Sequence, residues 1–153
     1  MITLEEFIRQ DINWLDALPE YQRKSIQQLL DQGKTYEEAA VIWLSANGPS
    51  NTHPFGTQNT KSIFFEKLLE EVESFFCRDD KYIEEKKQLL TQFKAGDVYV
   101  LTFISTVISP IVGASAPLIA PAIALILMTI LRMGLNAWCS LRREIKQNST
   151  QQS

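Results

Sequence analysis

The sequence predicts an all-α protein in which N-terminal amphipathic helices precede a C-terminal hydrophobic helical hairpin. Three observations predict this. Apolar side chains recur every three or four positions through residues 1–97, capping boxes mark helix starts there, and the 34 residues from Val98 to Leu131 carry no charged side chain. Charge is divided in the same way, because residues 1–97 hold 17 of the 18 acidic and 11 of the 15 basic residues. We therefore expect two parts with different surroundings.

Residues 1–47 are predicted to form an N-terminal helical hairpin region. Thr3 and Glu6 have the spacing of a capping box, which predicts that a first helix begins there and continues until Pro19 ends it. Proline suits the first turn of a helix, so a second helix is expected to follow directly. Gly33 is the expected left-handed residue at the end of that second helix.

A second capping box, Thr35 with Glu38, predicts a third short helix that ends before Pro49. The segment LLDQGKTYEEAAVIWL, within residues 28–44, resembles the first half of a helix-turn-helix. The resemblance implies that a basic recognition helix should follow at once. Residues 46–56 instead contain two prolines, two glycines and no lysine or arginine. Together with the acidic net charge of the chain, this disfavours nucleic acid as a partner.

Residues 48–60 are uncharged and rich in small polar residues and proline, which predicts a loop or hinge. Residues 61–97 are predicted to form a pair of amphipathic helices. The first has an aromatic stripe that is expected to pack in a core, and Asp79 or Asp80 can cap the second, which ends near Gly96.

Residues 98–139 are predicted to form the hydrophobic hairpin, which is expected to insert into a membrane. A helix with one face in water normally carries Lys or Glu every few positions, and this run has none. Glycine and proline favour a turn near Gly113 that separates two helical arms, Val98–Val112 and Ala116–Leu131. The arms would measure about 22 and 24 Å, against roughly 30 Å for a bilayer core. Continuing the second arm through Trp138 would let it reach across.

Small residues in the second arm predict contact between helices. Ala116, Ala120 and Ala124 are four positions apart, a pattern that allows close approach of helix backbones in lipid. We therefore expect self-association along this ridge.

Aromatic and basic residues at the ends of the hairpin predict its orientation. Tyr99 and Trp138 would lie at one membrane interface, and Arg132 would extend to that interface or face a polar lumen. The bases of residues 140–153 would then lie on the cytoplasmic side with both termini, and the tail from Gln147 onward reads as disordered.

No enzyme site is recognisable in the sequence. His53, the single histidine, lies between prolines and away from any cysteine, and no phosphate loop, serine elbow or metal-ligand cluster is present. We expect no catalytic residue, no cofactor and no metal. Cys77 and Cys139 match no disulfide or metal spacing, so we expect free thiols in a reducing cytosol.

Two functions fit these observations. The first is a small membrane protein whose residues 1–97 sense or bind a protein partner and whose hairpin forms an oligomeric pore or perturbs the bilayer. This layout is similar to that of small membrane effectors in bacterial defence systems. The alternative is a cytoplasmic helical adaptor or scaffold that buries the apolar segment in a partner or in its own oligomer. An accessory subunit of a membrane complex is a further possibility.

Overall fold

The structure is a computed structural model that describes residues 13–47, 57–92 and 96–152. These residues are helical and contain no strand, so the predicted all-α class is confirmed. The elements are, in chain order, η1 (Trp14–Ala17), α2 (Glu20–Asp31), α3 (Tyr36–Asn47), α4 (Thr57–Cys77), α5 (Ile83–Thr91), α6 (Asp97–Val112), α7 (Ala116–Met133) and α8 (Leu135–Gln152).

The start of the chain follows the predicted pattern where it is described. The capping box at Thr3 lies outside the described residues. The end of the first predicted helix is a single 3₁₀ turn, η1. The amide of its second residue, Leu15, donates to Asn13 Oδ1 at 3.1 Å. Pro19 then precedes α2, and Gly33 has φ +90° at its end, as expected from glycine's tolerance of positive φ.

The second capping box is present and fixes the start of α3. Thr35 N donates to Glu38 Oε1 at 2.9 Å, and Glu38 N donates to Thr35 Oγ1 at 3.0 Å. These reciprocal bonds satisfy two amides that have no partner inside the helix. The bond from the Thr35 amide to the Glu38 carboxylate, and after it hydrogen bonding by the Thr35 side chain, lowers the pKa of the Glu38 carboxyl.

The helix pair predicted over residues 61–97 has different bounds. Helix α4 begins earlier, at Thr57, so the last four residues of the predicted loop are helical, and residues 48–56 lie outside the described residues. Helix α5 ends at Thr91, and neither Asp79 nor Asp80 caps it. Asp80 instead forms a two-bond ion pair with Arg78, at 2.8 and 2.9 Å. A carboxylate paired with a guanidinium in this way cannot also turn toward the helix start.

The uncharged run folds into two helices, α6 and α7, that pack against each other. Gly113, with φ +78°, ends α6 at the predicted turn. The second arm does not continue through Trp138, because α7 stops at Met133 and Gly134 adopts φ +93° before α8 begins. Helix α8 reaches Gln152, so residues 147–152 are helical where the sequence indicated disorder.

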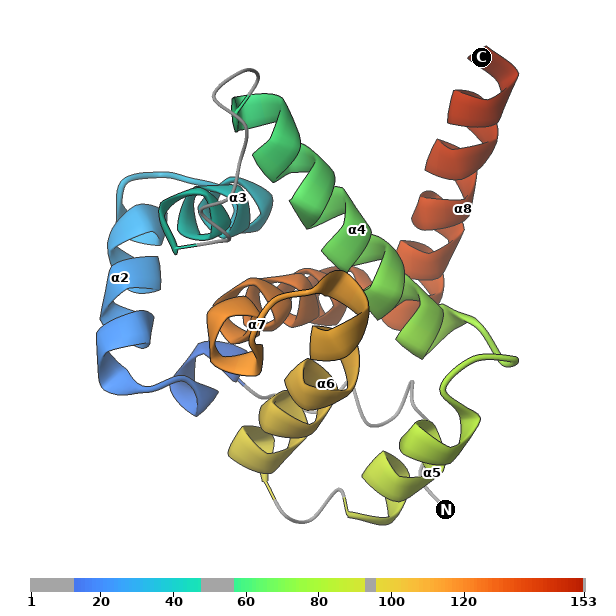
Figure 1. The fold of residues 1–153 in the computed structure, drawn as a ribbon, viewed down its shortest axis with the longest axis horizontal. Helices are drawn as coiled ribbons and strands as arrows, with labels where there is room; N and C mark the ends of the chain where they lie inside the picture. Colours follow the sequence, from blue (N-terminus) through green and yellow to red (C-terminus); the bar gives the residue numbers. More distant parts are fainter. Residues whose placement is uncertain (1–12, 48–56, 93–95, 153) are drawn as a thin grey trace.

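Helix α7 forms the centre of the core. Its most extensive contacts are with α3 and α6, and it also contacts η1, α2, α4 and α8. In Figure 1, α7 lies between α3 and α6 with α4 crossing beside it, while the C-terminal part of α8 projects away. One continuous apolar cluster therefore joins the charged N-terminal half of the chain to the uncharged run.

Candidate functional site

Nearly all of the middle of α7 is enclosed by the rest of the chain. Every residue from Pro121 to Leu127 is buried, as are Ile119 and Ile130. No charged side chain interrupts the helix before Arg132. A helix that is apolar on all sides belongs either in a protein core or in a membrane. Here α3 and α6 provide most of the covering, with η1, α2, α4 and α8 around them.

Two side chains from the N-terminal helices bind the backbone at the start of α7. Pro121 has no N–H, so it cannot donate to the carbonyl of Pro117 four residues earlier. The buried Gln22 of α2 donates to that carbonyl instead, at 3.0 Å. Trp43 of α3 donates from Nε1 to the neighbouring carbonyl of Leu118 at 2.8 Å. These bonds specify where α2 and α3 sit on α7, because buried polar groups need partners.

The outward side of α6 is unusual because it is exposed but uncharged. Val98, Thr102, Thr106 and Pro110 are spaced by four residues and all are exposed, with Val98 at 56%. The neighbouring Ile111 is 42% exposed. Helix faces in water normally carry charged residues. This row of apolar and hydroxyl side chains, which we call the α6 outer face, is therefore compatible with an apolar environment as well as with water.

The alanine ridge of α7 is used inside the chain. Ala124 is fully buried, while Ala116 and Ala120 are half-buried. The latter two line a cavity of about 210 Å³ together with residues of η1, α2 and α6. Small side chains let these elements approach α7 closely. Self-association through the ridge stays a prediction, and in this conformation the ridge faces the chain's own helices.

The remaining predicted site residues lie in different surroundings. Tyr99 is half-buried and its ring packs against Phe103, with centroids 5.9 Å apart. Trp138 is 3% exposed and belongs to the core. Arg132 is exposed, and its guanidinium lies 5.1 Å from the centroid of the Tyr36 ring on α3, a cation–π contact. Trp138 is thus covered by protein in this conformation.

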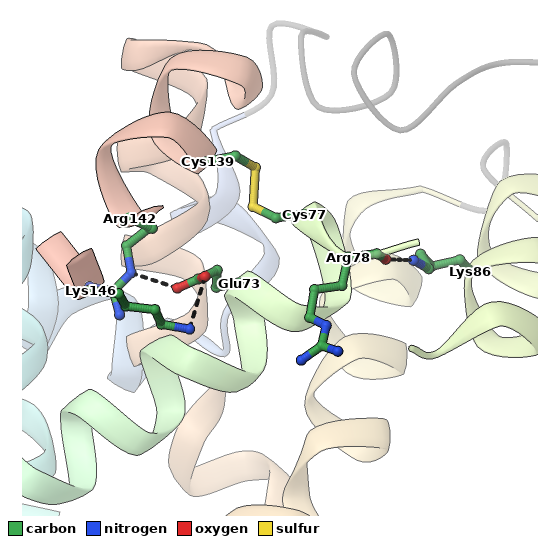
Figure 2. The surroundings of a disulfide bond; sticks show 7 residues. All are labelled: Glu73, Cys77, Arg78, Lys86, Cys139, Arg142 and Lys146. Carbon is green, nitrogen blue, oxygen red and sulfur yellow. Dashed lines mark hydrogen bonds and ion pairs between the residues drawn. A yellow bond between two sulfur atoms is a disulfide. The ribbon is translucent and has the colours of Figure 1, made fainter. Parts of the chain in front are cut away.

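Helices α4 and α8 are joined by a disulfide between Cys77 and Cys139, whose Cα atoms are 5.8 Å apart (Figure 2). The expectation of two free thiols is therefore wrong. The two cysteines are 62 positions apart, and such a spacing carries no information about proximity. They meet because one is the last residue of α4 and the other lies in the second turn of α8, where those helices pack together.

A buried ion-pair cluster lies beside the disulfide (Figure 2). Glu73 of α4 accepts from Arg142 Nε at 3.0 Å and pairs with Lys146 Nζ at 3.1 Å. The side chains of Glu73 and Arg142 are only 10% and 7% exposed, whereas Lys146 is half exposed. Glu66 adds a longer contact to Arg142, at 3.9 Å. Charges this deeply buried are tolerated only when they are paired and hydrogen-bonded.

A second polar group closes the turn after α4. Glu71 accepts from the Tyr82 hydroxyl at 2.5 Å and from Lys81 at 3.0 Å. Burial alone would raise the pKa of Glu71, but these two bonds outweigh it and the pKa is lowered. The pKa of the Tyr82 hydroxyl is raised well above its ordinary value, first by burial and then by its bond to the Glu71 carboxylate.

An apolar groove of about 230 Å³ runs between α3, α4, α7 and α8. The residues that line it include Phe65, Leu125, Ile126, Trp138 and the exposed Leu141 and Ile145. Among the described residues, no group of three His, Cys, Asp or Glu side chains could hold a metal ion. His53 lies outside the described residues. The chemistry available in the described part is therefore that of apolar surfaces, ion pairs and one disulfide.

Fold and site together define a class: an all-α protein built around an uncharged helix pair and cross-linked between α4 and α8. Of the described helices, α7 is the one long and apolar enough to cross a membrane, and half of it is buried within the chain. Helix α6 is apolar but has 16 residues. Comparisons of the chain with protein families, curated proteins and solved structures found no match.

Neither the disulfide nor the ion-pair cluster was found by sequence reasoning. Glu73 and Cys77 are four positions apart, and Cys139, Arg142 and Lys146 are spaced by three and four, so each set lies on one helix face. This spacing is the only signal that the sequence carries for the site. It does not say that the two faces meet.

Proposed function

We propose that this protein is a small membrane-active effector that holds two apolar helices in its core and can deliver them to a bilayer. In the closed bundle described above, α2, α3, α4 and α8 cover α7. In the membrane form α6 and α7 become a hairpin, copies of which assemble into a pore or perturb the bilayer. Both chain termini then stay on the cytoplasmic side, and residues 1–97 contact a protein partner.

The observation that carries this proposal is the α6 outer face. A helix pair that had evolved only as the core of a water-soluble bundle would place charged residues where it meets water. Helix α6 places Val98, Thr102 and Thr106 there. Threonine hydroxyls bond to the helical backbone in lipid, and valine needs no partner. Both helices can therefore leave the bundle with their charged residues, Asp97 and Arg132, at their ends and none in between.

The length of α7 also supports the proposal. Its 18 residues span about 27 Å at 1.5 Å per residue, close to the roughly 30 Å of a bilayer core. Arg132 lies one residue before its end, where a long basic side chain can reach the interface. A single hairpin cannot enclose an ion path, so a pore requires several copies.

The alternative, a helical adaptor that remains in water, is favoured by a different observation. The chain already buries residues 121–127 completely, so the uncharged run needs no lipid to satisfy it. In this second candidate the α6 outer face or the apolar groove would bind a protein, and the apolar helices would never leave the core.

A charge on the α6 outer face separates the two candidates. Thr106 is exposed in the closed bundle, so Thr106→Lys should leave folding intact, whereas a lysine in the middle of a bilayer costs roughly 2.5–3.5 kcal/mol. Thr91→Lys, at an exposed position on α5, is the matched control. We expect Thr106→Lys to reduce carbonate-resistant recovery with membranes at least tenfold, and Thr91→Lys to leave it unchanged.

Liposome leakage tests the pore itself. We expect the wild-type chain to release a trapped dye with a steep dependence on protein concentration, and Thr106→Lys to abolish release. If the wild-type chain is washed from membranes by carbonate and releases no dye at any concentration, the adaptor is the correct reading. If it stays in the membrane but sediments as a monomer in detergent and releases no dye, the pore is refuted, and the chain is better explained as an accessory subunit of a membrane complex.

A further inference from the structure

The contact between α4 and α8 contains two different kinds of link on successive helical turns. The disulfide joins Cys77 to Cys139, and one turn away the Glu73 carboxylate joins Arg142 and Lys146. Figure 2 shows both links on the same side of the two helices. One link is covalent and can be broken by reduction, whereas the other is ionic and does not respond to reductant.

The covalent link closes a ring around the apolar helices. Residues 78–138 lie inside it, and they include α5, α6, α7 and the whole uncharged run. A cross-link across a ring of this size disfavours the open or unfolded chain by about a thousandfold, through loss of chain entropy. The bond therefore opposes separation of α8 from α4 while α6 and α7 are in the core.

Helix α8 is buried over its first half. Among its described residues, Leu135, Trp138 and Arg142 are the buried ones, and all three lie in that half. Every described side chain from Arg143 to Asn148 is exposed, and Figure 1 shows this part projecting from the bundle. Cys139 lies between Trp138 and Arg142, at the centre of the short stretch that holds α8 in place.

This stretch also covers α7. Trp138 lines the apolar groove together with Leu125 and Ile126 of α7. All three are buried while α8 is docked. Displacement of α8 would therefore expose the side of α7 that it covers. The loss of apolar burial would be local at first, because α3 and α6 cover other parts of α7.

We propose that the Cys77–Cys139 disulfide is a reducible latch that keeps α8 on α4 and the apolar helices in the core. This inference rests on the proposed function only for what the released helices do next. The chemistry is thiol–disulfide exchange with a dithiol reductant. One reductant thiolate attacks one protein sulfur, forms a mixed disulfide with it and releases the other cysteine, which takes a proton. The second reductant thiol then attacks the reductant sulfur of the mixed disulfide and releases the remaining cysteine as a thiol. The reductant leaves as a cyclic disulfide.

The surroundings of the bond suit exchange. Both cysteines are half-buried and not enclosed in the core. Arg78 follows Cys77 directly and pairs with Asp80, and Arg142 lies on the next turn of α8 after Cys139 and pairs with Glu73. The bond therefore lies beside ion pairs and not in the wholly apolar surroundings that disfavour a thiolate.

Hydrogen exchange on the full chain tests the latch. The oxidised protein is compared with the same protein in excess dithiothreitol, and with the variant Cys77→Ser/Cys139→Ser. We expect amide protection in residues 135–148 to fall at least tenfold both in the reduced protein and in the serine variant, while protection in α2 and α3 changes less than twofold. An environment-sensitive apolar dye should bind more strongly to both, and reoxidation should reverse the two changes in the wild-type chain but not in the variant.

Two results would overturn the latch. Protection of α8 that is unchanged on reduction would mean that the ion pairs and Trp138 hold it without the bond. Protection that falls equally in all helices would mean that the disulfide is a global staple. Liposomes separate this inference from the proposed function. If reduction releases α8 but the chain does not bind membranes, the latch holds and the effector is refuted. If the chain binds membranes equally in its oxidised and reduced forms, the effector holds and the latch is refuted.

Discussion

Replacing Glu73 by leucine should destabilise the protein through the arginine that it leaves behind. The Arg142 side chain is 7% exposed, and among the described residues the ion pair left to it would be the longer one, at 3.9 Å, to the half-exposed Glu66. Lys146 is 48% exposed and can return to water. Removing one partner of a buried ion pair typically costs 3–5 kcal/mol. Because one of the two cations recovers its hydration, we expect the lower end, about 3 kcal/mol.

The assays are urea and thermal unfolding of the oxidised protein, both followed by circular dichroism. A loss of about 3 kcal/mol corresponds to a fall of roughly 6–12 °C in Tm for a chain of this size. Glu70→Leu, an exposed position on the same helix, is the control and should change stability by less than about 0.5 kcal/mol. The double variant Glu73→Leu/Arg142→Met removes both buried charges and should recover most of the loss.

The double variant decides whether the reasoning holds. If an unpaired arginine is the cause, the coupling energy between the two substitutions should be about 2 kcal/mol or more. Additive losses, or a cost below about 1 kcal/mol for Glu73→Leu alone, would show that solvent reaches Arg142 and that the cluster contributes little to the α4–α8 contact.

Three further perturbations test other parts of the structure. Ile123→Ala empties a fully buried position in α7 and should cost about 2–5 kcal/mol in urea unfolding, whereas Ile111→Ala, at a 42% exposed position, should cost less than about 1 kcal/mol. Tyr82→Phe removes a hydrogen bond that lowers the pKa of the Glu71 carboxyl in the folded protein. The stability that this carboxylate contributes is present above its unfolded pKa and is lost as the pH falls through its folded pKa. Because the variant has the higher folded pKa, thermal melts between pH 7 and 3 should show it losing stability at a higher pH than the wild type does. Trp43→Phe removes the bond from Nε1 to the Leu118 carbonyl and should cost about 1 kcal/mol; an unchanged melt would mean that this bond does not fix α3 on α7.

The local structure of this protein can be predicted from sequence because its signals are local. The Thr35–Glu38 capping box, the positive φ of Gly33, the turn at Gly113 and the bounds of α6 follow from residues within one or two helical turns. The same reasoning failed where two local signals competed. Apolar residues continue past Met133 and favoured one long helix, but the backbone at Gly134 takes positive φ and ends it.

What the sequence by itself determined is the helical class and the uncharged run, since both depend on residue type and spacing along one chain. The tertiary structure alone decided what surrounds that run and which distant residues meet. Cys77 and Cys139, or Glu73 and Arg142, become neighbours only because α4 and α8 pack together. Helical periodicity says which face of a helix is apolar, but not which residues cover that face, because those residues lie far away in the sequence.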